Sequence, residues 1–400
     1  MNISKIKKVY TSPIVATALA LFAMLFGSGN IAIPLGLGRD MGSMAGYAMI
    51  GFFLTAVLVP ILGIVAMALY EGDYQAFAER AGRIPGKLIV ALCLIVMGPL
   101  CVIPRCIAIS YLAIQWIIPQ LSLLSFSILT TLVLFAMTIR KNAVVGILSR
   151  YLGPLKLVLL SAVIAKGFFV APVVAPCLVH GWGTFTRGML EGYGTLDLLG
   201  VIFFSGFLLA NIKYDEQGAV RSRRSLLKLL IAAGALGAVL LGSLYAGFIL
   251  VSASQSGAQV CLAAQEGQLL SILATIILGA GGGTLASVTL ALACLTTAVA
   301  LTTIFAEYMT KECAAWSLPY PVSLGITLVV AAFFANYGFD GIKSILLPIV
   351  SVLYPALIVL TITNIFYKAW HIECGKLPFY GTLVFALIFQ TMWVYVRNYF

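Results

Sequence analysis

Apolar runs recur from one end of the chain to the other, separated by short polar segments. A run of about 20 apolar residues can cross the hydrocarbon core of a bilayer as one α-helix. The pattern predicts eleven spans, at residues 13–37, 44–69, 86–118, 121–139, 150–171, 194–213, 226–251, 284–309, 317–336, 342–366 and 378–397. We therefore expect an all-α polytopic membrane protein, with residues 1–400 forming a single transmembrane domain.

Composition agrees with this pattern, because 62% of the residues are hydrophobic and only 9% are charged. Most of the 24 Lys and Arg residues lie in alternate connecting segments, which are inner segments if the N-terminus is cytoplasmic. Basic residues favour cytoplasmic loops, so we expect a cytoplasmic N-terminus. This distribution accounts for the net charge of +11 without a nucleic-acid partner.

The first span is interrupted by residues 25–34, whose sequence is LFGSGNIAIP. Glycine weakens a helix, and proline removes a backbone donor. A broken helix is tolerated at membrane depth only where protein or a wet cavity covers the freed backbone groups. Such a break can hold a small charged ligand, whereas the alternative is that small residues here let two helices pack closely.

A second run with this character, residues 200–207 (GVIFFSGF), lies in the sixth span. Because the two spans are five apart, the second set of helices would enter the membrane from the opposite side. The sequence thus predicts inverted repeats at residues 13–171 and 194–366, and an additional C-terminal helix at 378–397. Paired broken helices of this kind mark transport sites near the bilayer midplane. The candidate substrate-binding residues are Gly27, Ser28, Gly29, Asn30, Phe203, Phe204, Ser205, Gly206 and Phe207.

The groups around these breaks indicate the class of substrate. Freed backbone amides suit a carboxylate, freed carbonyls suit an amine, and the phenylalanines suit an apolar side chain. We therefore expect a small zwitterion with a hydrophobic side chain.

A candidate cation site involves the eighth span, where Thr296 and Thr297 are adjacent. Hydroxyl and carbonyl oxygens are hard ligands that suit sodium, and the carbonyls of Ala23 and Phe26 would be free where the first span unwinds. The alternative is that each hydroxyl bonds to its own helix four residues back.

Three cationic side chains fall within predicted spans. Arg105 is a functional-site candidate, because a charge at membrane depth is costly, but an ion pair with Glu307 or Asp197 is the interpretation we favour. Lys156 and Lys166 are expected to extend their ammonium groups towards the interface. Either lysine could instead replace a bound cation, which would indicate proton coupling.

An enzyme is not expected. The only two histidines lie in loops predicted to be on opposite sides of the membrane, and no known catalytic motif is present. Cys177 and Cys261 fall in predicted outer segments, and whether they form a disulfide is left open.

Several stretches in order along the chain carry a family resemblance. They are residues 22–34, Gly98-Pro99-Leu100 with Pro104-Arg105, Gly153-Pro154-Leu155-Lys156, Gly192-Tyr193 with residues 197–200, residues 294–299 with Ala306-Glu307, and Pro348 with Tyr354-Pro355. With these stretches the chain resembles the BrnQ-type branched-chain amino acid carriers, the leucine-isoleucine-valine cation symporter family. Carriers of this family usually have about twelve spans, one more than predicted here.

The resemblance implies a leucine-transporter-like fold with two inverted five-helix repeats and broken helices 1 and 6. It implies a substrate site between spans one and six, with the substrate carboxylate at the amides of Ser28 and Gly29. It also implies a sodium site that adds the Ala293 carbonyl to Ala23, Phe26, Thr296 and Thr297. Sodium would be the coupling ion unless a lysine on the fifth span takes its place, as in other members of the fold, and no other cofactor is expected.

The function implied is import of Leu, Ile or Val, with Met as a further candidate, across the bacterial inner membrane by alternating access. Two alternatives stay open. One is a proton-coupled or exchange carrier of another apolar amino acid. The other is a non-transporting membrane sensor that signals through the basic residues 221–224.

Overall fold

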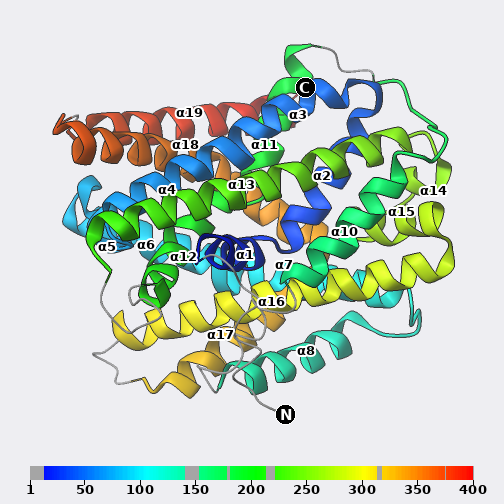
Figure 1. The fold of residues 1–400 in the computed structure, drawn as a ribbon, viewed down its shortest axis with the longest axis horizontal. Helices are drawn as coiled ribbons and strands as arrows, with labels where there is room; N and C mark the ends of the chain where they lie inside the picture. The colour runs from blue at the N-terminus through cyan, green and yellow to red at the C-terminus, as the bar shows by residue number, and fades with distance from the viewer. Residues whose placement is uncertain are drawn as a thin grey trace.

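The computed structural model describes residues 13–139, 153–177, 181–212, 221–312, 318–373 and 375–399. Each of the eleven predicted runs contains helix within these ranges. Figure 1 shows the helices packed side by side, with the longer ones running roughly along the long axis of the molecule. The all-α architecture expected from the hydrophobic pattern is therefore confirmed.

The first four predicted runs form helices that are mostly in pieces. They are α1 (Pro13–Leu25), α2 (Ser28–Met41), η2 (Gly42–Met44), α3 (Ala45–Phe53), η3 (Leu54–Leu58), α4 (Val59–Leu69), α5 (Tyr74–Ala78), η4 (Glu79–Ala81), α6 (Arg83–Ile95), η5 (Val96–Leu100), α7 (Val102–Gln115) and α8 (Leu123–Thr138). The third run bends at Gly98, whose backbone is non-helical just before Pro99.

The rest of the chain contains the longest helices. The elements are α10 (Gly153–Gly167), α11 (Trp182–Tyr193), α12 (Asp197–Ile212), α13 (Arg223–Ser254), α14 (Gln259–Leu262), η7 (Glu266–Gln268), α15 (Leu269–Leu278), α16 (Ala280–Glu312), α17 (Tyr320–Ala335), α18 (Gly338–Trp370) and α19 (Leu377–Tyr399). Five stretches of the described chain are long and apolar enough to cross a membrane by themselves: Ser28–Leu69, Arg83–Gln115, Arg223–Ser254, Ala280–Lys311 and Gly338–Trp370.

Helix α1 lies near the centre of the bundle (Figure 1) and packs against α10, α12, α13 and α16. Its aromatic residue Phe22 and the adjoining Phe26 are fully buried and stack on each other, with ring centroids 4.9 Å apart. Large apolar side chains such as Leu88, Val239 and Val329 are instead about two-thirds exposed, at 65–68%. An apolar outer surface on a helical bundle is what a lipid-facing protein requires.

The second interruption lies elsewhere than predicted. Residues 200–207 are continuous helix within α12, and the chain unwinds earlier, at 194–196, between α11 and α12. The Ser205 hydroxyl donates to the Val201 carbonyl over 2.6 Å, one turn back in the helix. Gly200 and Gly206 serve close packing, since an added Cβ would meet Leu25 at 2.5 Å and the Gly72 carbonyl oxygen at 2.7 Å. The prediction of a break at 200–207 was therefore wrong.

The segment between α13 and α16 folds back onto the bundle through α14, η7 and α15. Its Leu269 and Leu273 are buried, and η7 packs against α2 and α7. Cys261 in α14 is not joined to Cys177 by a disulfide, so the pairing that the sequence left open is not formed.

Candidate substrate and cation site

The first helix break is made by two residues. α1 ends at Leu25, α2 begins at Ser28, and Gly27 between them has extended backbone angles of φ −119° and ψ −152°. In a continuous helix the Gly27 amide would donate to the Ala23 carbonyl. It donates instead to Oδ1 of Asn30 over 3.1 Å, and so the Ala23 carbonyl is left for another donor.

Glycine is required at position 27 by a close approach. A Cβ added there would lie 2.7 Å from Oγ1 of Thr297 and 2.9 Å from its Cγ2. The broken backbone therefore rests directly on α16, where the predicted threonine pair lies.

The second break occupies Gly194, Thr195 and Leu196. Leu196 has a positive φ of 63°, an uncommon conformation for a residue with a branched side chain. Around this break the Gly194 carbonyl accepts a hydrogen bond from Nη1 of Arg105 over 2.7 Å, and the Leu198 amide donates to the Tyr354 hydroxyl over 2.9 Å. Groups from other helices thus satisfy backbone that α11 and α12 leave unpaired.

One polar cluster joins the two breaks. The Asn30 side-chain amide donates to Oδ1 of Asp197 over 2.6 Å and also contacts the Tyr245 hydroxyl. The Tyr245 hydroxyl donates to Oδ2 of Asp197 over 2.6 Å. All three side chains are at most 2% exposed, so this cluster holds the start of α2, the start of α12 and the middle of α13 together.

The ammonium group of Lys156 lies at the first break. Nζ donates to the carbonyls of Ala23 and Phe26 over 3.0 and 2.9 Å, and to Oγ1 of Thr296 over 3.4 Å. Lys156 is 3% exposed, and Nζ lies 5.7 Å from the ring centroids of both Phe22 and Phe26. The expectation that this lysine reaches the interface was wrong, whereas Lys166 on the same helix is exposed.

The residues expected to bind sodium are gathered in one place. Two of the carbonyls, those of Ala23 and Phe26, and the Thr296 hydroxyl surround the Lys156 ammonium. The Ala293 carbonyl accepts a hydrogen bond from the Thr296 hydroxyl over 2.7 Å. The buried hydroxyl of Thr297 has no hydrogen-bond partner.

A small cavity lies between the two breaks, of about 20 Å³. Apolar residues of α1, η5, α7 and α16 line it, together with Gly27, Ser28, Asn30, Arg105, Thr195, Leu196, Asp197, Gly200, Phe204 and Thr297. The cavity has room for about one water molecule, so an amino acid would enter only after the surrounding helices move apart.

The predicted substrate residues divide into two groups. Gly27, Ser28, Asn30 and Phe204 line the cavity, and Gly29 lies against the Arg105 guanidinium, where an added Cβ would be 2.4 Å from Nη2. Three others point elsewhere. Phe203 contacts Tyr74, with ring centroids 5.3 Å apart; Ser205 bonds its own helix; Gly206 packs on Gly72. The side chain of Phe207 lies outside the described part of the structure.

Arg105 does not form the ion pair that we favoured. Its side chain is 3% exposed and bonds the Gly194 carbonyl, while its Nε atom has no partner.

Sequence reasoning also missed Tyr245, which completes the polar cluster. A tyrosine in the middle of an apolar span is a usable signal, because a buried hydroxyl needs a partner.

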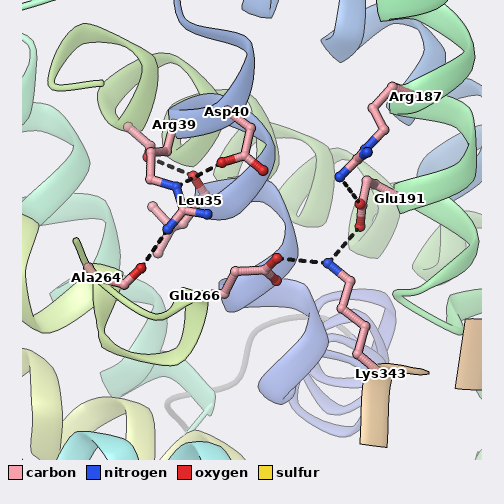
Figure 2. Close-up of polar contacts among 9 residues, drawn as sticks. Leu35, Arg39, Asp40, Arg187, Glu191, Ala264, Glu266 and Lys343 are labelled. Carbon is pink, nitrogen blue, oxygen red and sulfur yellow. Dashed lines mark hydrogen bonds and ion pairs between the residues drawn. The ribbon is translucent and has the colours of Figure 1, made fainter. Parts of the chain in front are cut away.

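A chain of ion pairs links η7, α11 and α18 (Figure 2). Lys343 of α18 bridges Glu266 of η7 over 2.7 Å and Glu191 of α11 over 3.3 Å, and Arg187 pairs with Glu191 over 3.2 Å. Nearby, Nη1 of Arg39 donates to the Ala264 carbonyl over 2.6 Å. These contacts fasten the segment between α13 and α16 to α2, α11 and α18.

Comparison with known proteins relates this chain to a family. A family model described as branched-chain amino acid transport protein matches residues 11–397. The branched-chain amino acid permease BraB of Bacillus subtilis is 29% identical over 355 residues, which cover 87% of this chain and 78% of that protein. The permease BrnQ of Escherichia coli K12 is 26% identical over 383 residues, covering 94% and 85%.

Solved structures agree on the fold. The nucleobase-cation-symport-1 family transporter Mhp1, in a closed conformation with bromovinylhydantoin bound, superposes with a TM-score of 0.66 at 13% identity, covering 95% of this chain and 92% of that one. A manganese transporter of Eremococcus coleocola superposes with a TM-score of 0.56 at 14% identity, covering 98% and 87%. The fold is leucine-transporter-like, as expected. The chain is thus a transport protein and not an enzyme, and it belongs to the branched-chain amino acid transport protein family.

Proposed function

We propose that this protein imports Leu, Ile or Val, with Met as a further substrate, across the bacterial inner membrane by cation-coupled alternating access. The observation that carries the proposal is the cavity between the two helix breaks. It combines the amides at the start of α2, the charged groups of Arg105 and Asp197, and the apolar ring of Phe204. Such a lining suits a zwitterion with an apolar side chain.

The small size of the cavity supports alternating access. A cavity of about 20 Å³ cannot admit leucine, so uptake requires α1, α2, α11 and α12 to move relative to the rest of the bundle. The chain interruptions at Phe26-Gly27 and at 194–196 are natural places for such hinges.

For coupling, the position of Lys156 favours a proton over the sodium ion expected from the sequence. The ammonium occupies the space among the carbonyls of Ala23 and Phe26 where a sodium ion would bind. The ammonium donates hydrogen bonds to carbonyls of the unwound segment, and loss of its proton would weaken these hydrogen bonds. Protonation of Lys156 would thereby be coupled to the conformation of α1.

Sodium remains a second candidate for one reason. The buried Thr297 hydroxyl lacks a hydrogen-bond partner and lies beside the Gly27 backbone. An ion that displaced the Lys156 ammonium could use this oxygen as a ligand, together with that of Thr296.

The test is uptake of labelled leucine into proteoliposomes containing the purified protein. We expect uptake to be driven by an inward pH gradient in potassium buffer, and to be competed by Ile and Val but not by Asp or Lys. Uptake that requires an inward sodium gradient and does not change with the pH gradient would overturn proton coupling. Absence of leucine uptake under both gradients would overturn the transport proposal.

A matched pair of variants assigns the coupling group. K156M removes the buried ammonium, and K166M removes an exposed cation from the same helix. We expect K156M to abolish gradient-driven uptake and K166M to retain it. Gradient-driven uptake by K156M at the wild-type rate would exclude Lys156 as the coupling group.

We propose the orientation and the repeats together. The N-terminus would be cytoplasmic, with inverted repeats at residues 13–171 and 194–366 and an additional helix at 378–397. Accessibility of single cysteines, introduced one at a time into each connecting segment of a cysteine-free variant, tests the orientation in intact cells.

A further inference from the structure

The Arg105 guanidinium is a buried cation whose donors are not all used. Nη1 donates to the Gly194 carbonyl over 2.7 Å, Nε is buried without a hydrogen-bond partner, and the whole side chain is 3% exposed. Among the described residues no carboxylate forms an ion pair with it. A buried charge that forms no ion pair is destabilising, so the presence of this arginine needs another explanation.

The guanidinium lies where other groups also favour an anion. It sits against the first turn of α2, since a Cβ on Gly29 would lie 2.4 Å from Nη2 and 2.8 Å from Cζ. α2 has 14 residues and begins at Ser28, and the unpaired amides of a helix N-terminus attract negative charge. Arg105 and Ser28 both line the cavity between the breaks.

The same cavity carries an anionic group. Asp197 lines it, with Oδ1 accepting a hydrogen bond from Asn30 and Oδ2 one from Tyr245, and the Thr195 side chain also bonds the carboxylate. A carboxylate has about four acceptor sites, so capacity remains for a further donor. The two opposite charges are not paired with each other, and both face the cavity.

We propose that Arg105 binds the α-carboxylate of the substrate through its free guanidinium edge, and that Asp197 accepts the α-ammonium group. The inference rests on the proposed function, because it specifies how the same cavity selects its substrate. Arginine suits this role, since its planar fork can donate two parallel hydrogen bonds to a carboxylate. The site would then require a free α-carboxylate and an α-amine, while the apolar residues bind the side chain.

A ligand series on the wild-type protein gives the first test. Leucine, leucinamide and 4-methylpentanoate are compared as competitors of labelled leucine binding to the purified protein in detergent. Leucinamide lacks the carboxylate and 4-methylpentanoate lacks the amine, and we expect each to compete about 100-fold more weakly than leucine, as loss of one partner of a buried charged pair predicts. Leucinamide competing as well as leucine would overturn the assignment to Arg105.

Variants of Arg105 separate its contribution from that of the α2 amides. In R105Q we expect leucine to bind about 100-fold more weakly while leucinamide binds as in wild type, so that the preference for leucine is lost. R105K retains the charge without the fork and should give an intermediate loss. K166Q, which removes an exposed cation, is the matched control and should leave the preference unchanged.

The outcomes distinguish the two proposals. If wild-type protein binds no branched-chain amino acid, the proposed function fails before Arg105 is tested. If wild type binds leucine and R105Q keeps the full preference for leucine over leucinamide, the Arg105 assignment fails alone. If R105Q does not fold, as judged by its elution in size-exclusion chromatography, then R105K decides, and an unchanged leucine preference in R105K overturns the assignment.

Discussion

The side-chain amide of Asn30 donates a hydrogen bond to Oδ1 of Asp197 over 2.6 Å, across 167 positions of sequence. Oδ1 of Asn30 also accepts a hydrogen bond from the Gly27 amide, which makes no helical hydrogen bond to α1. One side chain therefore stabilises the first break and connects it to the start of α12, just after the second break.

We expect N30A to destabilise the protein by about 2–5 kcal/mol, because it leaves the buried Gly27 amide without its acceptor and removes the donor to Oδ1 of the buried Asp197 carboxylate. The thermal unfolding midpoint in detergent, followed by the fluorescence of a cysteine-reactive dye, measures the change. N336A is the control, since Asn336 is exposed at the end of α17. Equal midpoints for the two variants would contradict this role of Asn30.

We expect G27A to lower stability by about 1–3 kcal/mol, a typical cost of overpacking. The new methyl would lie 2.7 Å from Oγ1 of Thr297, so the unwound segment would have to move away from α16. The double variant G27A/T297A removes the clashing atoms and should recover part of the loss. If T297A gives no recovery, the close approach between the break and α16 is not the reason for glycine.

The packing role of Gly206 is tested in the same way. An alanine there would place Cβ 2.7 Å from the Gly72 carbonyl oxygen, and we expect a loss of about 1–3 kcal/mol. G381A in α19 meets no atom within 4 Å and should be neutral or stabilising by up to about 1 kcal/mol, since alanine favours helix. A neutral G206A would reinstate residues 200–207 as a candidate flexible segment.

The ion pairs around Lys343 give a pH prediction. Burial raises the pKa of Glu266 above its ordinary value of 4.5, although Lys343 opposes the shift. The folded protein thus binds a proton at Glu266 more readily than the unfolded chain. The stabilisation from this proton is fully present below pH 4.5 and is lost as pH rises through the raised pKa.

The comparison of wild type with E266Q isolates this effect. We expect the wild-type midpoint, relative to that of E266Q, to increase as pH falls from 7 towards 4.5. A wild-type advantage that grows instead as pH rises would mean that the Lys343 ion pair outweighs burial at this position.

The sequence located the first break because its causes are local. Glycines at 27 and 29 and the amide of Asn30 lie at or beside the interruption, although Pro34 falls inside α2. The second break has no comparable signal. Leu196 takes a positive φ while its neighbours bond to Arg105 and Tyr354 from distant helices. Tertiary contacts of that kind are not encoded in a window of local sequence.

The direction of buried side chains was the second feature that the sequence did not predict. Hydropathy predicted that Lys156 and Lys166 lie on one helix, but both were expected to extend to the interface. Lys156 is buried and Lys166 is exposed because of how α10 is rotated about its axis. This rotation directs Lys156 towards the interior of the bundle, near α1 and α16. The position of Arg105 within an apolar span also marked its charge as unusual, but it did not identify the Gly194 carbonyl as its partner.

The ammonium that binds the carbonyls of Ala23 and Phe26 belongs to Lys156 and is therefore covalently attached to the chain. A diffusible ion would leave such oxygens when the medium is diluted, whereas a tethered one stays at a fixed effective concentration. The unwound segment between α1 and α2 should therefore keep its conformation in salt-free buffer.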